Sequence, residues 1–149
     1  MPSTKWYSPK YKQAGLAYEV AVAIQHNRIV WVNGPFPAGE NDKKIFDKPG
    51  GLKSKLKEGE ALIGDQGYRG TSGKVATRNQ FDSPEIKDFK ERSKARQETV
   101  NSRLKSFDIL STDFRTTGKL RLLRHKMVME ACAVLIQYEL ENGSALYTV

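Results

Sequence analysis

A segment of alternating side chains limits most strongly what this chain can fold into. Residues 18–24 have the sequence YEVAVAI, in which every second residue is a large apolar or aromatic one. This period of two is typical of a half-buried β-strand. After a short turn at His26 and Asn27, residues 29–32 are IVWV, apolar on both faces as in a more central strand. Together the two segments predict a β-hairpin.

The residues after the hairpin predict short pieces of structure. A loop with two prolines and two glycines, NGPFPAGEN, leads to Asn41 or Asp42, either of which can cap a short helix beginning with KKIF. A second helical piece, LKSKLKEGE, is expected to end at Gly59. The segment ALIGD then predicts a short strand, and VAT at residues 75–77 a further small one.

Two long helices are predicted in the second half of the chain. Ser83 followed by Pro84 and Glu85 is a helix start, since serine caps and proline suits the first helical position. One apolar stripe of this helix contains Ile86, Phe89, Val100, Leu104 and Phe107. The last helix, over about 120–140, is apolar nearly all round between residues 128 and 136, which predicts burial. The order of elements predicts an α/β fold with helices packed on a mixed sheet.

Composition limits the class of protein. The chain has 149 residues, 28% of them charged and 38% hydrophobic, which suits one globular domain. The net charge of +8 favours an anionic partner, most commonly nucleic acid, although a solubilising surface explains it equally well. Basic residues cluster within 53–57, 87–96 and 115–126, which favours contact with a nucleic-acid backbone. The longest apolar run, residues 131–136, is too short to span a bilayer, so no membrane partner is expected.

Two carboxylates are candidates for chemistry. Asp65 ends the predicted strand, where ligands of open α/β sheets bind, and Gly67 lets the backbone turn away from it. A capping aspartate that satisfies loop amides is the more common explanation of such a position. Glu98 lies on the first long helix, off its apolar stripe, where pairing with Lys94 explains it as well. Spacing alone favours the structural explanation for both.

If the two carboxylates converge, they suit a hard divalent cation such as Mg²⁺ or Mn²⁺. Two such ions, about 4 Å apart, can activate water and stabilise the leaving oxygen of a phosphodiester. One cysteine and two distant histidines give no pattern for tetrahedral zinc. Gly50 and Gly51 lack the lysine and hydroxyl residue of a Walker loop.

Five segments together resemble the catalytic region of DDE transposases, the DDE superfamily endonucleases, and in particular their Harbinger-like branch. They are YEVAVAIQHNRIVWVNGPFPAGENDKKIF, GEALIGDQGYRG, RSKARQETVNSRLKSFDIL, FRTTGKLRLLRHK and QYELENGSALYTV. The similarity extends from about Trp6 to the C-terminus. It implies an RNase H-like core whose acidic triad binds two divalent metal ions, Mg²⁺ or Mn²⁺, and cleaves and joins DNA strands.

The resemblance also implies roles for individual residues. The family's second aspartate ends a strand and is followed by Gly-Tyr one residue on, which matches Asp65. Its glutamate lies in a pattern like Arg-x-Glu-x-x-Asn-x-Arg-x-Lys, which matches Glu98. Asp65 and Glu98 are therefore the implied catalytic metal ligands. The implied supporting and DNA-binding residues are Arg96, Asn101, Arg103 and Lys105.

One departure from the family affects the expected organisation. The family's first catalytic aspartate lies on the first core strand, upstream of the segment matching WYSPKYK at residues 6–12. This chain begins just before that segment, and Asp42 matches a family position that is not catalytic. We therefore expect an N-terminal arm over residues 1–15 and a partial RNase H-like catalytic domain over residues 16–149, without the first core strand.

The expected function follows from this organisation. The chain is expected to be part of a metal-dependent DNA endonuclease whose cleavage is weak or absent in this polypeptide alone, so that enzyme status stays open. The alternatives are a domesticated, non-catalytic DNA- or partner-binding protein and a basic structural or ribosome-associated protein. DNA is the expected partner, and a partner protein or second copy is expected to cover an exposed edge of the hairpin. In a eukaryotic cell the expected location is the nucleus.

Overall fold

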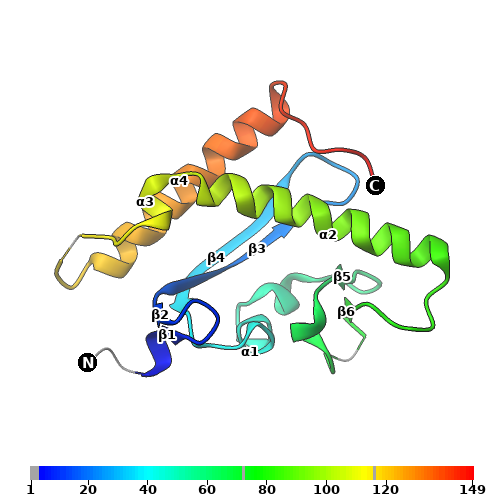
Figure 1. Ribbon diagram of the computed structural model, residues 1–149, viewed down its shortest axis with the longest axis horizontal. Helices are drawn as coiled ribbons and strands as arrows, with labels where there is room; N and C mark the ends of the chain where they lie inside the picture. The colour runs from blue at the N-terminus through cyan, green and yellow to red at the C-terminus, as the bar shows by residue number, and fades with distance from the viewer. Residues whose placement is uncertain (1–3, 72, 116) are drawn as a thin grey trace. The chain divides into compact units, whose positions relative to one another are not determined.

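The chain forms a mixed α/β structure (Figure 1). The computed structural model describes residues 4–71, 73–115 and 117–149. In these residues the paired strands make three two-stranded sheets, one short helix lies between the second and third sheets, and the two long helices follow all the strands along the chain. The predicted mixture of strands and helices is confirmed, and the RNase H-like arrangement stays a prediction. The chain divides into two compact units, the first made of the residues up to Glu19 with Asn33–Lys94, the second of Val20–Val32 with Ala95–Val149.

Two antiparallel hairpins occupy the N-terminal part of the chain. Within the expected arm, β1 (Tyr7–Ser8) pairs with β2 (Gln13–Ala14). The predicted hairpin is confirmed as β3 (Leu16–Val22) paired with β4 (Ile29–Pro37). The second of these strands is longer than predicted and continues beyond the apolar IVWV segment through the proline-containing loop sequence. The end of the hairpin is closed where Ala23 N donates to Arg28 O at 2.9 Å.

A short parallel pair of strands lies around the candidate aspartate. Strand β5 (Leu62–Ile63) pairs with β6 (Val75–Ala76), and the pairing is extended by the bond from Gly64 N to Ala76 O at 3.0 Å. The carboxyl ends of two parallel strands lie at the same edge. The segment after β5, which begins with Asp65, and the segment after β6 are therefore neighbours.

Helix α1 (Asp42–Asp47) begins as predicted, because Asn41 Oδ1 accepts a hydrogen bond from Lys43 N at 2.8 Å. The helix buries Ile45 and Phe46 and contacts the 3₁₀ turn η3 (Gln66–Tyr68). The predicted second helical piece was too long. Only a 3₁₀ turn, η2 (Leu52–Lys55), forms there, because Leu52 is buried whereas residues 57–60, three of them charged, are exposed and give a helix no face to pack.

Helix α2 (Pro84–Lys105) confirms the predicted start, since Ser83 Oγ accepts from Ile86 N at 3.3 Å. Its apolar stripe is only partly buried. Val100 is 0% exposed, whereas Ile86 is 46% exposed and Phe89 42%. The predicted stripe therefore packs only in the C-terminal half of the helix. The short helix α3 (Asp108–Ser111) follows it.

Helix α4 (Arg121–Glu141) corrects the prediction that the last helix is buried all round. One face is buried and contains Met129, Cys132, Ala133, Ile136 and Leu140. On the opposite face Met127 is 60% exposed, Val134 67% and Tyr138 66%. A sequence can show that a helix is apolar on every face, but not that the core meets only one of them. None of the helices in the described residues combines the length and apolar composition that a membrane span needs.

Candidate metal site

Asp65 lies at the carboxyl edge of the parallel pair β5 and β6, as the sequence predicted. It is the N-cap of η3, and its Oδ1 accepts a hydrogen bond from Gly67 N at 2.8 Å. The capping role considered from the sequence is thus present. It does not exclude metal binding, because a carboxylate has several lone pairs and this bond uses one of them. The Asp65 residue remains exposed to solvent.

Gly64 fixes how closely the Asp65 turn approaches the neighbouring strand. A Cβ atom at Gly64 would lie 2.7 Å from Val75 Cγ1 and 3.0 Å from Tyr68 Cδ2. These distances are too short for any side chain, so the residue before Asp65 has to be glycine unless β6 or Tyr68 moves. The turn is held on its other side by the Tyr68 ring, which meets the Phe46 ring edge-on with centroids 5.8 Å apart.

A second carboxylate, that of Asp42, lies beside Asp65. A Cβ atom at Gly67 would lie 3.0 Å from Asp65 Oδ1 and 3.6 Å from Asp42 Oδ2. Both carboxylates therefore border the space that a side chain at residue 67 would fill. Sequence reasoning did not assign Asp42 to the site. The only local signal was its place in the first turn of α1, and nothing in the sequence put that turn beside η3.

The electrostatics of this site are those of crowded negative charge. Burial, and then the charge of Asp65, raise the pKa of the Asp42 carboxyl, while Lys10 opposes the shift. Burial also raises the pKa of Tyr68, with further contributions from Asp42, Glu19 and Asp65. The Tyr68 hydroxyl is therefore neutral at physiological pH, and the carboxylates around it produce a potential that favours a cation.

The carboxylate oxygens at this site are the type of ligand that a hard divalent cation prefers, but two carboxylates are too few to hold one alone. Asp42 and Asp65 offer carboxylate oxygens, which Mg²⁺ and Mn²⁺ prefer, around the space that a side chain at Gly67 would fill. Within the described ranges, no group of three or more His, Cys, Asp or Glu residues is arranged to hold a metal ion. The first unit therefore brings two carboxylates close together, and metal binding by them stays a prediction.

Glu98 lies on the exposed side of α2, away from the buried Arg96 and Val100. It belongs to the second unit, whereas Asp65 belongs to the first. The convergence of Glu98 with Asp65 stays a prediction.

The basic and amide residues expected near the DNA make contacts within the second unit. Arg96 is 3% exposed and donates to Ala23 O at 3.2 Å, to His26 O at 2.7 Å and to Tyr147 O. Arg103 donates to Ser144 O at 2.8 Å. Asn101 Oδ1 accepts from Gln97 Nε2 at 3.2 Å, and Lys105 is exposed. These contacts give Arg96 a structural role, and DNA binding by the four residues stays a prediction.

Comparison with known proteins gives one family. The sequence model of a family described as DDE superfamily endonuclease matches residues 1–137. No curated protein and no solved structure matches the chain significantly. The matched range contains both Asp65 and Glu98.

Proposed function

The chain belongs to the DDE superfamily endonucleases, and from this premise we propose that it forms part of a divalent-metal site that cleaves DNA phosphodiester bonds. The family points to a nuclease with a DNA substrate, and its members generally use divalent metal ions. The finer proposal is a Harbinger-like catalytic domain with an RNase H-like core over residues 16–149, preceded by an arm over residues 1–15. In a eukaryotic cell its place would be the nucleus.

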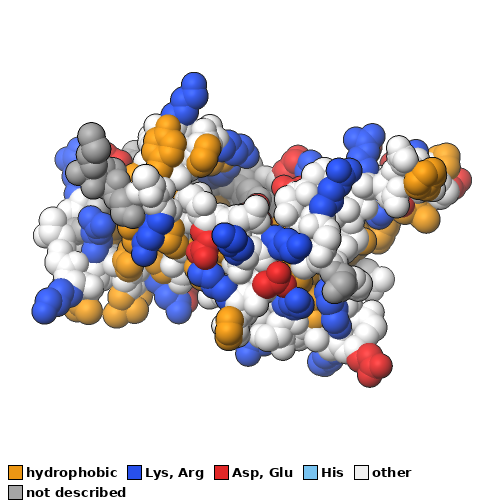
Figure 2. Space-filling model, turned by 90° about the horizontal axis from the view of Figure 1, so that it is seen from below, with side chains coloured by type: hydrophobic (Ala, Val, Ile, Leu, Met, Phe, Trp, Pro, Cys, Tyr) orange, Lys and Arg blue, Asp and Glu red, His pale blue; other side chains and the backbone are white. Residues whose placement is uncertain are grey.

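One observation carries this proposal. Asp65 lies at the carboxyl edge of two parallel strands, and a second carboxylate faces it across Gly67. Ligand sites of α/β sheets lie at such edges, and two carboxylates at short range are favoured only when a cation or proton reduces their repulsion. The prevalence of Lys and Arg side chains on the face shown in Figure 2, with the net charge of +8, supports a DNA substrate.

The residues are proposed to act as follows. Asp65 and Glu98 each give a carboxylate oxygen to the metal, and Asp42 adds negative charge beside Asp65. When bound, divalent ions activate water and stabilise the leaving oxygen of the phosphodiester. Arg96, Arg103 and Asn101 support the helix that bears Glu98, and Lys105 adds positive charge for the DNA backbone. We expect weak cleavage by this polypeptide alone, because Asp65 and Glu98 are two of the three carboxylates that the family uses.

Metal binding and DNA cleavage are best measured separately. Calorimetry with Mn²⁺ on the wild type, Asp65→Asn and Glu98→Gln should show weaker binding in both variants, and Asp113→Asn, an exposed aspartate between α3 and α4, is the matched control. Nicking of supercoiled plasmid with Mn²⁺ should be slow and should disappear in both variants. An unchanged Mn²⁺ affinity in Asp65→Asn would contradict the site. Rapid nicking that both variants abolish would contradict only the expectation of weak activity.

A second candidate function is a non-catalytic DNA- or partner-binding protein. The bare apolar face of α4 favours it, because exposed apolar surfaces of this kind mark interaction sites. Salt-dependent DNA binding without any metal-dependent cleavage would support this second function over the first.

A further inference from the structure

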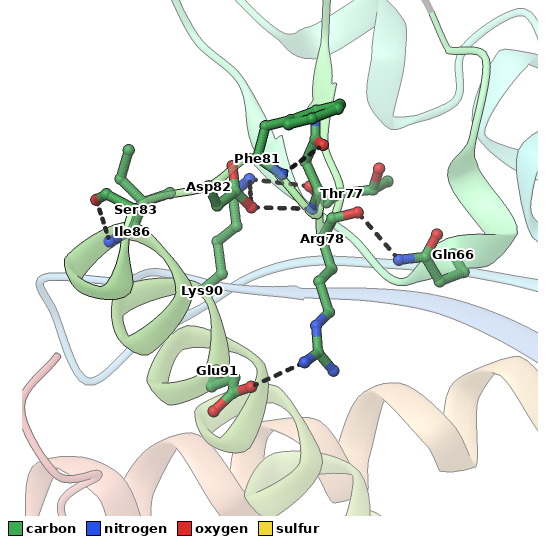
Figure 3. A network of polar contacts seen from close by, with 10 residues as sticks. Gln66, Thr77, Arg78, Phe81, Asp82, Ser83, Ile86, Lys90 and Glu91 are labelled. Carbon is green, nitrogen blue, oxygen red and sulfur yellow. Dashed lines mark hydrogen bonds and ion pairs between the residues drawn. The ribbon is translucent and has the colours of Figure 1, made fainter.

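A polar cavity lies at the same edge of β5 and β6 as Asp65. Its volume is ≈ 610 Å³. Polar and charged residues that line it include Arg69, Thr77, Arg78, Asn79, Asp82 and Lys90. The segment after β6 supplies most of the lining. Gln66, the residue after Asp65, donates from Nε2 to Arg78 O at 3.2 Å and so joins the two segments (Figure 3). The cavity therefore adjoins the candidate metal site.

The loop that lines the cavity is held in one shape by its own side chains. Asp82 Oδ2 accepts from Asn79 N at 2.9 Å and from Lys90 Nζ at 2.8 Å. Lys90 Nζ also donates to Thr77 O at 2.9 Å, which ties the loop to α2 (Figure 3). A loop whose amides and carbonyls are satisfied in this way needs little rearrangement to bind a ligand.

The positive charge in the cavity comes from two arginines. The charge of Lys90 is balanced by Asp82. Arg78 lies 4.0 Å from Glu91, but both side chains are more than half exposed, and such surface pairs contribute little. Arg69 is exposed, four residues after Asp65. Planar guanidinium groups donate several N–H bonds in a geometry that matches phosphate oxygens.

We propose that this cavity binds a backbone phosphate of the DNA substrate through Arg69 and Arg78. The proposal deepens the proposed nuclease function, since a phosphate held there positions a strand beside Asp65. Thr77 and Asn79 supply further polar groups to the cavity wall. Lys90 and Asp82 act on the loop and not on the ligand.

The test is the salt dependence of DNA binding, measured in EDTA so that no cleavage is needed. Fluorescence anisotropy with a labelled duplex is recorded over a salt series for the wild type and for the double variant that combines Arg69→Gln and Arg78→Gln. The plot of log K against log salt has a negative slope, and each lost phosphate contact makes it less steep by about 0.9. Loss of the one phosphate shared by the two arginines should therefore make the slope less steep by about 1. Arg92→Gln, on α2 and paired with Asp88, is the matched control.

An unchanged slope in the double variant, or an equal fall in Arg92→Gln, would overturn the phosphate site. The outcome is separable from the nuclease proposal, because a chain that cleaves DNA with an unchanged slope retains the metal site and loses only this cavity. A chain that cleaves nothing can still show the slope change.

A different observation, within the second unit, supports an independent inference. The exposed face of α4 is a continuous apolar stripe. Its members are spaced three or four residues apart along the helix and are Leu123, Met127, Ala131, Val134, Leu135 and Tyr138, all exposed. This stripe lies opposite the buried face, so the packing that buries that face leaves the stripe exposed.

The charges of α4 indicate which partner covers the stripe. Arg121 and Arg124 lie near its N-terminal end and Glu139 and Glu141 near its C-terminal end, whereas Lys126 pairs with Glu130 within the helix at 3.8 Å. Two antiparallel copies therefore bring opposite charges together at both ends of the contact. Ala131 is at the middle of the stripe, where its small side chain permits close approach. In this register Met127 of one copy faces Leu135 of the second copy.

We infer that the stripe pairs with the same stripe of a second copy about a two-fold axis near Ala131. Such an isologous contact repeats every interaction twice, which is how most homodimers form. The apolar stripe then supplies the burial and the helix ends supply the orientation.

Sedimentation velocity tests this pairing. The wild type should be dimeric, Val134→Glu with Leu135→Glu should be monomeric, and Ile109→Glu, an exposed apolar position on α3, should remain dimeric. A charge exchange tests the orientation. Arg121→Glu with Arg124→Glu, and separately Glu139→Lys with Glu141→Lys, should each weaken the dimer, and an equimolar mixture should restore it. A wild type that is monomeric at about 100 µM, far above a micromolar Kd, or a mixture that restores nothing, would overturn the inference.

Discussion

Substitution of Arg96, two residues before the candidate Glu98, tests whether this arginine supports the fold or binds DNA. Arg96 is 3% exposed, and its guanidinium donates to three backbone carbonyls, two in the turn of the β3–β4 hairpin and one near the C-terminus. Replacement by leucine keeps only a short apolar side chain and removes all three bonds. We expect Arg96→Leu to destabilise the second unit strongly and to leave any DNA contact elsewhere unchanged.

The magnitude follows from the contacts. A hydrogen bond to a charged group contributes about 1.5–3 kcal/mol net. The three bonds of Arg96 are not additive, because the released carbonyls regain water once the turn relaxes. We therefore expect a loss of about 3–5 kcal/mol, the range for breaking a buried charged network. This is a large part of the 5–15 kcal/mol, roughly, that stabilises a typical domain.

Urea unfolding followed by circular dichroism measures this loss. Arg103→Leu is the matched control, because Arg103 is partly exposed and bonds a single carbonyl, that of Ser144. Its loss should be only about 1 kcal/mol, below the range for a buried charged bond, because the Arg103 bond is exposed to solvent. Arg96→Lys should recover only part of the stability, since one ammonium cannot reach three carbonyls with the geometry of a guanidinium. If Arg96→Leu loses less than about 1 kcal/mol and yet binds DNA more weakly, Arg96 is a DNA contact and the structural argument is wrong.

Three further predictions concern the first unit. Asp42→Asn should stabilise the protein at pH 7, because a raised folded pKa makes the ionised carboxyl unfavourable; the gain should vanish below the ordinary pKa of 3.8 in a urea series over pH. Gly64→Ala should cost about 1–3 kcal/mol in the same assay, because its Cβ would lie 2.7 Å from Val75 Cγ1. Asp82→Asn should lower Tm at pH 7, since the hydrogen bond from Lys90 lowers the pKa of Asp82; the difference from the wild type should disappear as pH falls through that lowered pKa. An equal effect of Asp82→Asn at all pH values would contradict this reasoning.

Features that depend on neighbouring residues were predictable from the sequence. The Asn41 cap, the start of α2 at Pro84 and the alternating strand of the hairpin each involve a few consecutive residues. The position of Asp65 after a strand also followed from its own segment. Each of these needs only local hydrogen bonding or a repeat of known period, both of which a sequence displays directly.

Features that depend on packing between distant segments were not predictable. The approach of Asp42 to Asp65 requires α1 to pack on η3, where the Phe46 ring meets the Tyr68 ring. No spacing in the sequence encodes that contact. The length of η2 and the half-exposed α4 have the same cause, because a helical pattern shows which faces are apolar and not which of them finds a partner.

The position of Asp42 supports the proposal that a cation binds beside the two carboxylates. Burial and the neighbouring Asp65 both raise the pKa of Asp42, so at neutral pH its ionised form lowers the stability of the fold. Helix capping does not explain why Asp42 is present despite this loss of stability, since Asn41 already caps α1 and Asp65 caps η3. A divalent ion over Gly67 would convert the repulsion into attraction to a shared charge. The stability gained in Asp42→Asn should therefore shrink when Mn²⁺ is added, because the negative charge of Asp42 makes the wild type bind the ion more tightly than the variant. A gain that is the same with and without Mn²⁺ would leave the carboxylate pair without a metal-binding explanation.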